Sequence, residues 1–174
     1  MMKKVLRSFA LVLVLAACGT KPPDPELHFA TVGFVLTLPA GMQAALDAVA
    51  PNFRTVRIDS FRSDVSQAAA MAGGGLQSMF ATIGDFDGDG TKDVIVEGAA
   101  PGDSALHVIA IMNGKTPRAF EVTRFPVYDA DAVGIYLSKA PGNQTGSFEV
   151  VNYPDVSTLY TYKSGGFVGT KLGP

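Results

Sequence analysis

The chain has 174 residues, with 14 Lys and Arg against 16 Asp and Glu, which gives a formal net charge of −2 at pH 7. This length suits one domain with a single hydrophobic core. The sequence contains no run of basic residues with interleaved aromatic residues, so nucleic-acid binding is disfavoured.

The first 17 residues have the pattern of a signal peptide. Lys3, Lys4 and Arg7 precede an apolar run over residues 9–17, which is too short to span a membrane. The run ends in Leu15-Ala16-Ala17-Cys18, which resembles the bacterial lipobox. That resemblance implies cleavage before Cys18, diacylation of this residue and a lipid anchor for the mature chain. The alternatives are an ordinary secretory signal with a coincidental cysteine and an uncleaved anchor.

Cys18 is the only cysteine, so the chain cannot form an internal disulfide, and lipidation accounts for the thiol. By the same resemblance, Gly19 in place of Asp after the cysteine favours sorting to the outer membrane of a Gram-negative cell. We therefore expect a lipid-anchored protein of the bacterial cell envelope that faces the periplasm or the cell surface. After the signal the sequence has no second apolar stretch of membrane-spanning length, so only the lipid is expected to contact the membrane.

Removal of residues 1–17 takes away three basic residues and no acidic one. It leaves 157 residues with 11 basic against 16 acidic side chains, a formal charge of −5. Residues 18–26 contain the modified cysteine and several prolines, which predicts a semi-rigid tether. The globular domain is expected over residues 27–174.

Two helices are predicted in the first part of this domain. The apolar residues between 42 and 49, the last of them Val49, have the i, i+3, i+4, i+7 spacing of an amphipathic helix. A second, shorter helix is predicted over residues 65–71, where Asp64 is expected to cap the N-terminus. The glycine run at 73–75 is expected to end it as a linker.

The stretch Gly84-Asp85-Phe86-Asp87-Gly88-Asp89-Gly90-Thr91-Lys92-Asp93 predicts a cation-binding loop. Its carboxylates are those of Asp85, Asp87, Asp89 and Asp93 at relative positions 1, 3, 5 and 9, and the backbone carbonyl of Thr91 falls at position 7. Ca²⁺ takes six to eight oxygen ligands, and a short loop with this spacing can wrap around one ion. Because four aspartates repel one another, the ordered loop is expected to depend on the cation. Gly88 and Gly90 are expected to adopt positive φ.

The loop is expected to join two strands. An EF-hand loop requires a bidentate Glu at position 12, but Val96 occupies this position and Glu97 follows one residue too late. Strand-forming residues flank the loop on both sides. Residues 83–96 resemble the calcium loop of FG-GAP or VCBS-type repeats, which joins two strands of a β-propeller blade. The resemblance implies that the four aspartates are side-chain ligands and that Thr91 is a backbone ligand.

A closed propeller is not expected, because propellers need about four to eight blades and this chain has one such loop. Two alternatives remain open for the ion. The ion either has a structural role and holds two strands together, or it takes part in binding a ligand or partner.

Beyond residue 76, short β-rich runs recur at intervals of about ten residues between turn-forming residues. The predicted strands cover residues 79–83, 93–97, 106–112, 119–125, 133–137, 148–152, 158–162 and 167–170. Sequential strands with short links favour an antiparallel meander. We therefore expect an α+β fold, with one or two N-terminal helices packed on a twisted antiparallel sheet and a strand-loop-strand calcium site.

Three other groups of residues invite functional interpretations. Neither histidine belongs to a catalytic or zinc-binding motif, and His107 is expected to be an ordinary strand residue, whereas His28 lies beside the tether. Asp129 and Asp131 are either turn residues or the paired carboxylates of a hydrolase or a second cation site. The tyrosines are either core residues or a sugar-binding face. They are Tyr128, Tyr136, Tyr153, Tyr160 and Tyr162.

The sequence favours a non-enzymatic, lipid-anchored calcium-binding module with a structural role or with contacts to an envelope protein or glycan. We expect neither catalytic residues nor a small-molecule cofactor. The alternatives are an envelope hydrolase or carbohydrate-active enzyme that uses Asp129 and Asp131, and a small inhibitor or accessory subunit.

Overall fold

The computed structural model describes residues 21–30, 33–72, 79–126, 129, 132–140, 142, 144–154 and 156–173. The predicted signal peptide with Cys18, the glycine run at 73–75, Tyr128 and Asp131 lie outside the described residues. The expectations that concern them stay predictions.

The described part of the chain contains first a hairpin, then a helical segment and then a series of strands. The hairpin consists of β1 (Glu26–Ala30) and β2 (Gly33–Thr37). The helical segment contains α1 (Ala40–Val49), β3 (Arg54–Thr55), the 3-10 helix η1 (Ile58–Ser60) and α2 (Ser63–Met71). The remaining strands are β4 (Ala81–Gly84), β5 (Asp93–Ala99), β6 (Leu106–Met112), β7 (Arg118–Phe125), β8 (Ile135–Lys139), β9 (Ser147–Asn152), β10 (Val156–Lys163) and β11 (Gly166–Leu172).

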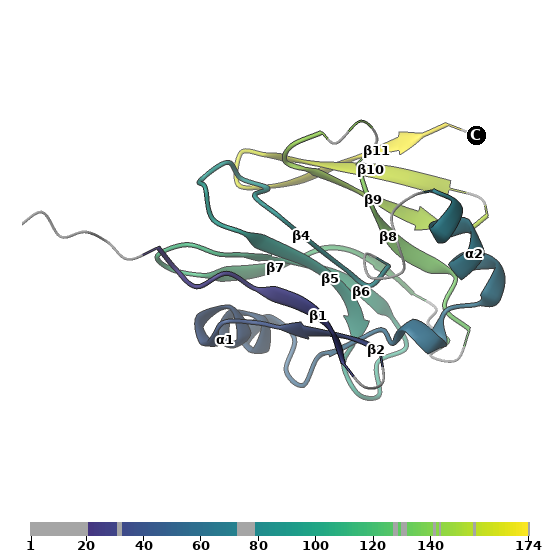
Figure 1. Ribbon diagram of the computed structural model, residues 1–174, viewed down its shortest axis with the longest axis horizontal. Helices are drawn as coiled ribbons and strands as arrows, with labels where there is room; N and C mark the ends of the chain where they lie inside the picture. Colours follow the sequence, from purple (N-terminus) through teal and green to yellow (C-terminus); the bar gives the residue numbers. More distant parts are fainter. Residues whose placement is uncertain are drawn as a thin grey trace, which may run out of the picture.

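Strands β3 to β11 form two antiparallel sheets that face each other (Figure 1). The first sheet has the order β3-β5-β6-β7, and β4 pairs with the first half of β5. The second has the order β11-β10-β9-β8. The N–H of Leu137 on β8 donates to the carbonyl oxygen of Met79 at 2.8 Å and so ties the two sheets together before β4. In Figure 1, the second sheet lies above the first, and α1 and the β1–β2 hairpin lie below it.

The alternation of side chains along β5 and β6 divides the core into two layers. Ile95 and Val108 belong to the cluster between the two sheets. Val96 and Ile109 belong to a second cluster with Met42 of α1. The first sheet is therefore covered on both faces, which explains the nearly continuous apolar sequence of its central strands.

The predicted α+β fold class is confirmed. Each of the eight predicted strands is present, with ends displaced by at most two residues. The strands divide between two sheets, whereas the meander pattern suggested one. The connection over residues 126–134 is longer than the hairpin turns, and the chain crosses from the first sheet to the second along it.

Three local features differ from the predictions. The β1–β2 hairpin was not predicted at all. The prediction of Asp64 as the N-cap of α2 was wrong, because the helix begins at Ser63, two residues earlier than predicted, and Arg62 occupies the cap position without a side-chain cap. An ion pair of 3.0 Å with Arg62 holds the Asp64 carboxylate in the first turn instead. Val49, predicted on the buried face of α1, is 46% exposed because it is the last residue of the helix.

Candidate metal centre

The acidic loop connects β4 to β5 at one end of the molecule (Figure 1). Gly84 and Asp93 form the last pair of the β4–β5 ladder, so the two strands hold the ends of the loop side by side. Gly88 and Gly90 have φ of +80° and +85°, as predicted. Two sharp turns that favour glycine thus let a short segment fold back on itself.

Three carboxylates converge inside the loop. Asp85, Asp87 and Asp89 each offer one oxygen, and these atoms all lie within 4.8 Å of one another. The Asp85 carboxylate accepts hydrogen bonds from the N–H groups of Gly88 at 2.8 Å and Gly90 at 3.0 Å. The Asp87 carboxylate accepts one from the N–H of Asp89 at 3.2 Å. Backbone donors therefore orient the carboxylates, and the group could hold a metal ion.

Thr91 fixes the third carboxylate. Its N–H and its hydroxyl both donate to Oδ1 of Asp89, at 2.8 and 2.6 Å. These two hydrogen bonds hold the pKa of Asp89 below its ordinary value, so this group stays ionised at neutral pH. The sequence indicated a backbone ligand at Thr91, which stays a prediction, but it did not reveal the hydroxyl contact.

Asp93 is placed differently from the other three aspartates. It is fully buried, and its two oxygens accept hydrogen bonds from the N–H groups of Phe86 at 2.9 Å and Asn113 at 2.8 Å. Burial raises its pKa to about 6, although these two hydrogen bonds act in the opposite direction. Asp93 thus ties the acidic loop to the β6–β7 turn, and its role as a fourth ligand stays a prediction.

Phe86 anchors the loop in the core between the sheets. Its side chain is 7% exposed, and its ring packs edge to face against Phe148 and Phe167, with centroid distances of 6.0 and 5.9 Å. Phe148 and Phe167 belong to strands of the second sheet, whereas the loop belongs to the first. The sequence analysis did not predict this anchor. The signal that could have indicated it is the position of an aromatic residue, Phe86, between Asp85 and Asp87.

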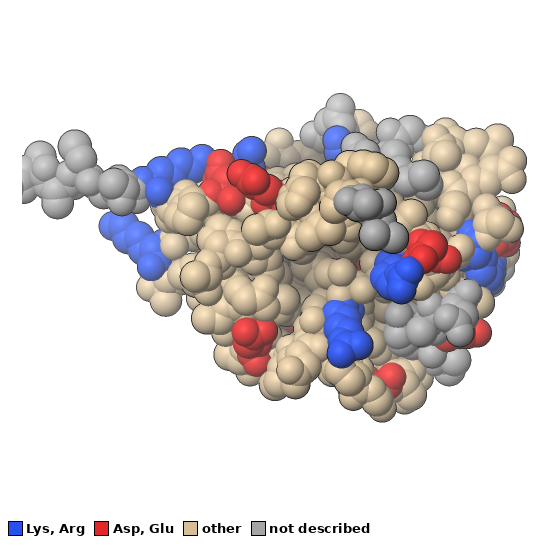
Figure 2. Space-filling view, turned by 60° about the horizontal axis from the view of Figure 1, so that its bottom comes forward, with Lys and Arg blue, Asp and Glu red and all other residues tan. Residues whose placement is uncertain are grey.

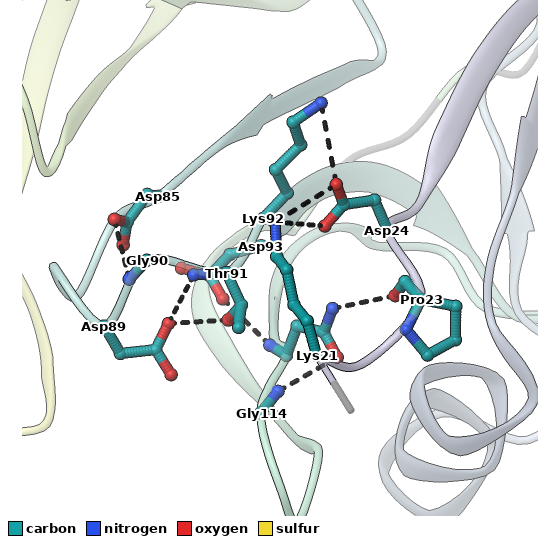
Figure 3. A network of polar contacts seen from close by, with 11 residues as sticks. Lys21, Pro23, Asp24, Asp85, Asp89, Gly90, Thr91, Lys92, Asp93 and Gly114 are labelled. Atoms are coloured by element: carbon teal, nitrogen blue, oxygen red, sulfur yellow. Dashed lines mark hydrogen bonds and ion pairs between the residues drawn. The ribbon is translucent and has the colours of Figure 1, made fainter. Parts of the chain in front are cut away.

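The N-terminal segment lies against the same loop, as Figure 3 shows for Lys21, Pro23 and Asp24. The amide of Asn113 donates to the carbonyl oxygen of Pro23 at 3.0 Å. Asp24 forms ion pairs with Lys21 at 3.4 Å and with Lys92 at 3.9 Å. Residues 21–26 of the predicted tether are therefore in contact with the domain. Residues of this segment and of the acidic loop together line a groove of about 720 Å³.

Neither histidine belongs to the group of Asp85, Asp87 and Asp89, although His28 lines the groove between the N-terminal segment and the acidic loop. His107 was expected to be an ordinary strand residue, but it bridges two carboxylates. Its Nδ1 lies 2.5 Å from Oε2 of Glu121, and its Nε2 lies 2.8 Å from Oδ2 of Asp103. Because both ring nitrogens are engaged, this arrangement does not favour a role as a general base. His28 is exposed on β1.

The other candidate groups are only partly described. Asp129 is exposed and lines a cavity of about 200 Å³ near Val133, and Asp131 lies outside the described residues, so their pairing stays a prediction. Tyr160 and Tyr162 pack against the core between the sheets. The Tyr160 ring stacks on Phe148 at 5.4 Å between centroids. For these two tyrosines the structure favours core packing over an exposed sugar-binding face.

Comparisons with protein-family models, with curated protein sequences and with solved structures found no match to the chain. Within the described part of the chain, no helix is both long enough and apolar enough to cross a membrane. The functional argument therefore rests on the residues of the site itself.

Proposed function

We propose that this protein is a non-enzymatic, lipid-anchored calcium-binding module of the bacterial cell envelope, with a structural role or with contacts to an envelope protein or glycan. The observation that carries the proposal is the convergence of the Asp85, Asp87 and Asp89 carboxylates within 4.8 Å on a strand-loop-strand segment. The lipobox-like sequence at Cys18 supports the anchor.

The donor set favours calcium over other metals. The converging side chains offer carboxylate oxygens, which are hard ligands, whereas zinc and copper sites in proteins commonly use His or Cys. Mg²⁺ demands nearly ideal octahedral geometry, while Ca²⁺ accepts the irregular geometry that a turn of alternating aspartates provides. Among the described ion pairs none involves Asp85 or Asp87, so these carboxylates are not neutralised by a Lys or Arg contact.

The first test is a calcium titration by calorimetry on the mature protein after treatment with chelator. We expect one saturable site with a dissociation constant of about 10⁻⁴–10⁻³ M, as for other extracellular calcium modules. Asp85→Ala and Asp89→Ala should each abolish the heat of binding. Asp47→Ala is the matched control, because Asp47 is an exposed carboxylate on α1 outside the loop.

The lipid anchor is tested separately by the mass of the N-terminal peptide of protein purified from membranes. A diacylated Cys18 at the N-terminus is expected, and Cys18→Ala should leave the signal peptide in place. Wild-type protein that binds no calcium would overturn the calcium-binding part of the proposal, and an unmodified thiol at Cys18 would overturn the anchor.

A further inference from the structure

Several of the described loops between consecutive strands lie at the end of the molecule where the described chain begins (Figure 1), whereas the β5–β6 loop lies at the opposite end. The first of these two ends, here called the loop end, comprises the acidic loop, the β6–β7 turn, the β8–β9 turn, the β10–β11 turn and residues 21–26. Arg118 at the start of β7 donates to the carbonyl oxygen of Gly165 in the β10–β11 turn at 3.0 Å. Lys139 and residues 144–146 of the β8–β9 turn line a cavity of about 240 Å³ together with Asp85.

The loop end carries most of the basic side chains of the chain after residue 17. Six of these 11 residues lie here, and all six are exposed: Lys21, Lys92, Lys115, Arg118, Lys139 and Lys163. Figure 2 shows basic side chains around the acidic cluster where the described chain begins. Near α2, by contrast, Arg57 and Arg62 form ion pairs with Asp59 and Asp64. Basic groups are thus concentrated at one end of the molecule.

The charge of the loop end depends on the metal. Six acidic residues accompany the six basic ones: Asp24, Glu26, Asp85, Asp87, Asp89 and Asp93. Without an ion the formal charges balance, and one Ca²⁺ in the acidic loop changes the formal charge of this surface to +2. Calcium would therefore convert a neutral surface into a positive one.

The segment that leads to Cys18 is fixed close to this surface. The contacts of Pro23 with Asn113 and of Asp24 with Lys92 hold it against the domain. Between Lys21 and Cys18 the chain advances three residues, which reach at most about 11 Å. A lipid on Cys18 would therefore keep the loop end within roughly one Debye length of the headgroups, where an anionic leaflet attracts basic side chains.

We infer that the calcium-loaded loop end docks on an anionic lipid surface, with its exposed lysines among the headgroups. The inference rests on the lipid anchor and the calcium site of the proposed function. It adds a partner, the anionic lipid surface, and it adds that calcium regulates the docking. Without calcium the balanced charge removes the electrostatic attraction, so the same domain stays anchored by its lipid but no longer lies on the membrane.

The test uses the purified lipidated protein reconstituted in vesicles of phosphatidylcholine, alone or mixed equally with phosphatidylglycerol. A water-soluble amine-acylating reagent reports the exposure of each lysine by peptide mass spectrometry. On the mixed vesicles with calcium, acylation of Lys92, Lys115 and Lys163 should slow by about fivefold or more, and chelator should restore it. Lys171 is exposed near the end of β11, away from the β10–β11 turn, and is the internal reference whose rate should not change.

The double variant Lys115→Glu with Lys163→Glu should lose the protection of Lys92, whereas Lys171→Glu should keep it. Equal acylation of Lys92 on both kinds of vesicle, in protein that carries the lipid and binds calcium, would overturn this inference and leave the proposed function intact. An unmodified Cys18 or a missing calcium site, measured on the same preparation, would instead overturn the proposed function and this inference with it.

Discussion

Glu97 on β5 is fully buried, and neither of its carboxylate oxygens has a hydrogen-bond partner among the described residues. It alternates with Val96, so its side chain lies on the same face as Ile95, toward the core between the sheets. Burial raises the pKa of Glu97 well above its ordinary value. A buried polar group without a partner destabilises a fold, so an apolar residue in place of Glu97 should increase the stability of the protein.

This carboxyl group predicts a specific dependence of stability on pH. Because its pKa is higher in the folded chain than in the unfolded one, its contribution is most favourable below about pH 4.5 and declines as the pH rises toward the folded-state pKa. Glu97→Gln removes the titration, so the free energy of unfolding of the wild type should fall relative to the variant by up to about 1.4 kcal/mol for each pH unit in that range. Urea unfolding at a series of pH values measures the difference.

Glu26→Gln is the control for that experiment, because Glu26 is exposed on β1. This variant should keep the pH dependence of the wild type. At neutral pH, Glu97→Met should be more stable than the wild type by about 1–3 kcal/mol, because the apolar side chain removes an unpartnered polar group. Parallel curves for wild type and Glu97→Gln would show that Glu97 does not titrate in this range.

At the scale of elements, His107 joins the loop between β5 and β6 to strand β7 through Asp103 and Glu121. Burial acts to lower the pKa of His107, but the hydrogen bonds to Glu121 and Asp103 outweigh it and raise the pKa above its ordinary value. A base with a raised pKa stabilises the fold fully below about pH 6.5, and this stabilisation is lost as the pH rises through the folded-state pKa.

His107→Gln should therefore destabilise the protein at about pH 5.5 and have little effect at about pH 9. Thermal melts of both proteins at the two pH values measure the effect. His28→Gln serves as control, since His28 is an exposed strand residue and should leave the melting temperature unchanged at both values. An equal loss at both pH values would mean that His107 contributes through packing and not through its charge.

Phe86 connects the acidic loop to the second sheet, so its removal should affect both stability and metal binding. Phe86→Ala should lower the free energy of unfolding by about 3–5 kcal/mol, because a buried ring is lost and a cavity remains. It should also weaken calcium binding, because the ring fixes the backbone between Asp85 and Asp87, and the N–H of this backbone donates to Asp93. Urea unfolding and a calcium titration test the two effects.

Phe29→Ala is the matched control, because the Phe29 side chain is 71% exposed on the hairpin. It should change the free energy of unfolding by less than about 1 kcal/mol and leave calcium binding intact. Calcium affinity unchanged in a folded Phe86→Ala protein would show that the loop does not need its anchor in the core.

Elements whose signal lies in a few neighbouring residues could be predicted from the sequence, whereas elements stabilised by distant residues could not. The β10–β11 turn has positive φ at Ser164 and Gly165. Glycines in a short turn sequence predict such a backbone conformation. The β1–β2 hairpin carries a weaker signal, because prolines precede it and His28 and Phe29 are both exposed. Its pairing is stabilised by contacts with residues distant in the chain, which periodicity does not report.

The candidate site shows the same division. The alternating aspartates and the positive φ of Gly88 and Gly90 follow from local chemistry and were predicted. The burial of Asp93, by contrast, depends on Asn113, which lies 20 residues away in the chain. The packing of the predicted tether beside the loop also depends on this residue. Such contacts follow from how the strands assemble and not from the spacing of residues in the loop.

At the scale of the whole molecule, the acidic loop belongs to the first sheet, is anchored by Phe86 in the second, and holds the N-terminal segment through Lys92. A ligand bound only by the folded loop should therefore stabilise all of these parts together. At free calcium about ten times the dissociation constant, the stabilisation is about 1.4 kcal/mol.

For a domain of this size, that stabilisation should raise the melting temperature by about 3–6 °C in one cooperative transition. Differential scanning calorimetry in calcium and in chelator measures this shift, and Asp89→Ala should show none. A transition that splits in two on removal of calcium would mean that the loop and the N-terminal segment unfold apart from the two sheets. In that case the ion would order one end of the molecule without stabilising the two sheets.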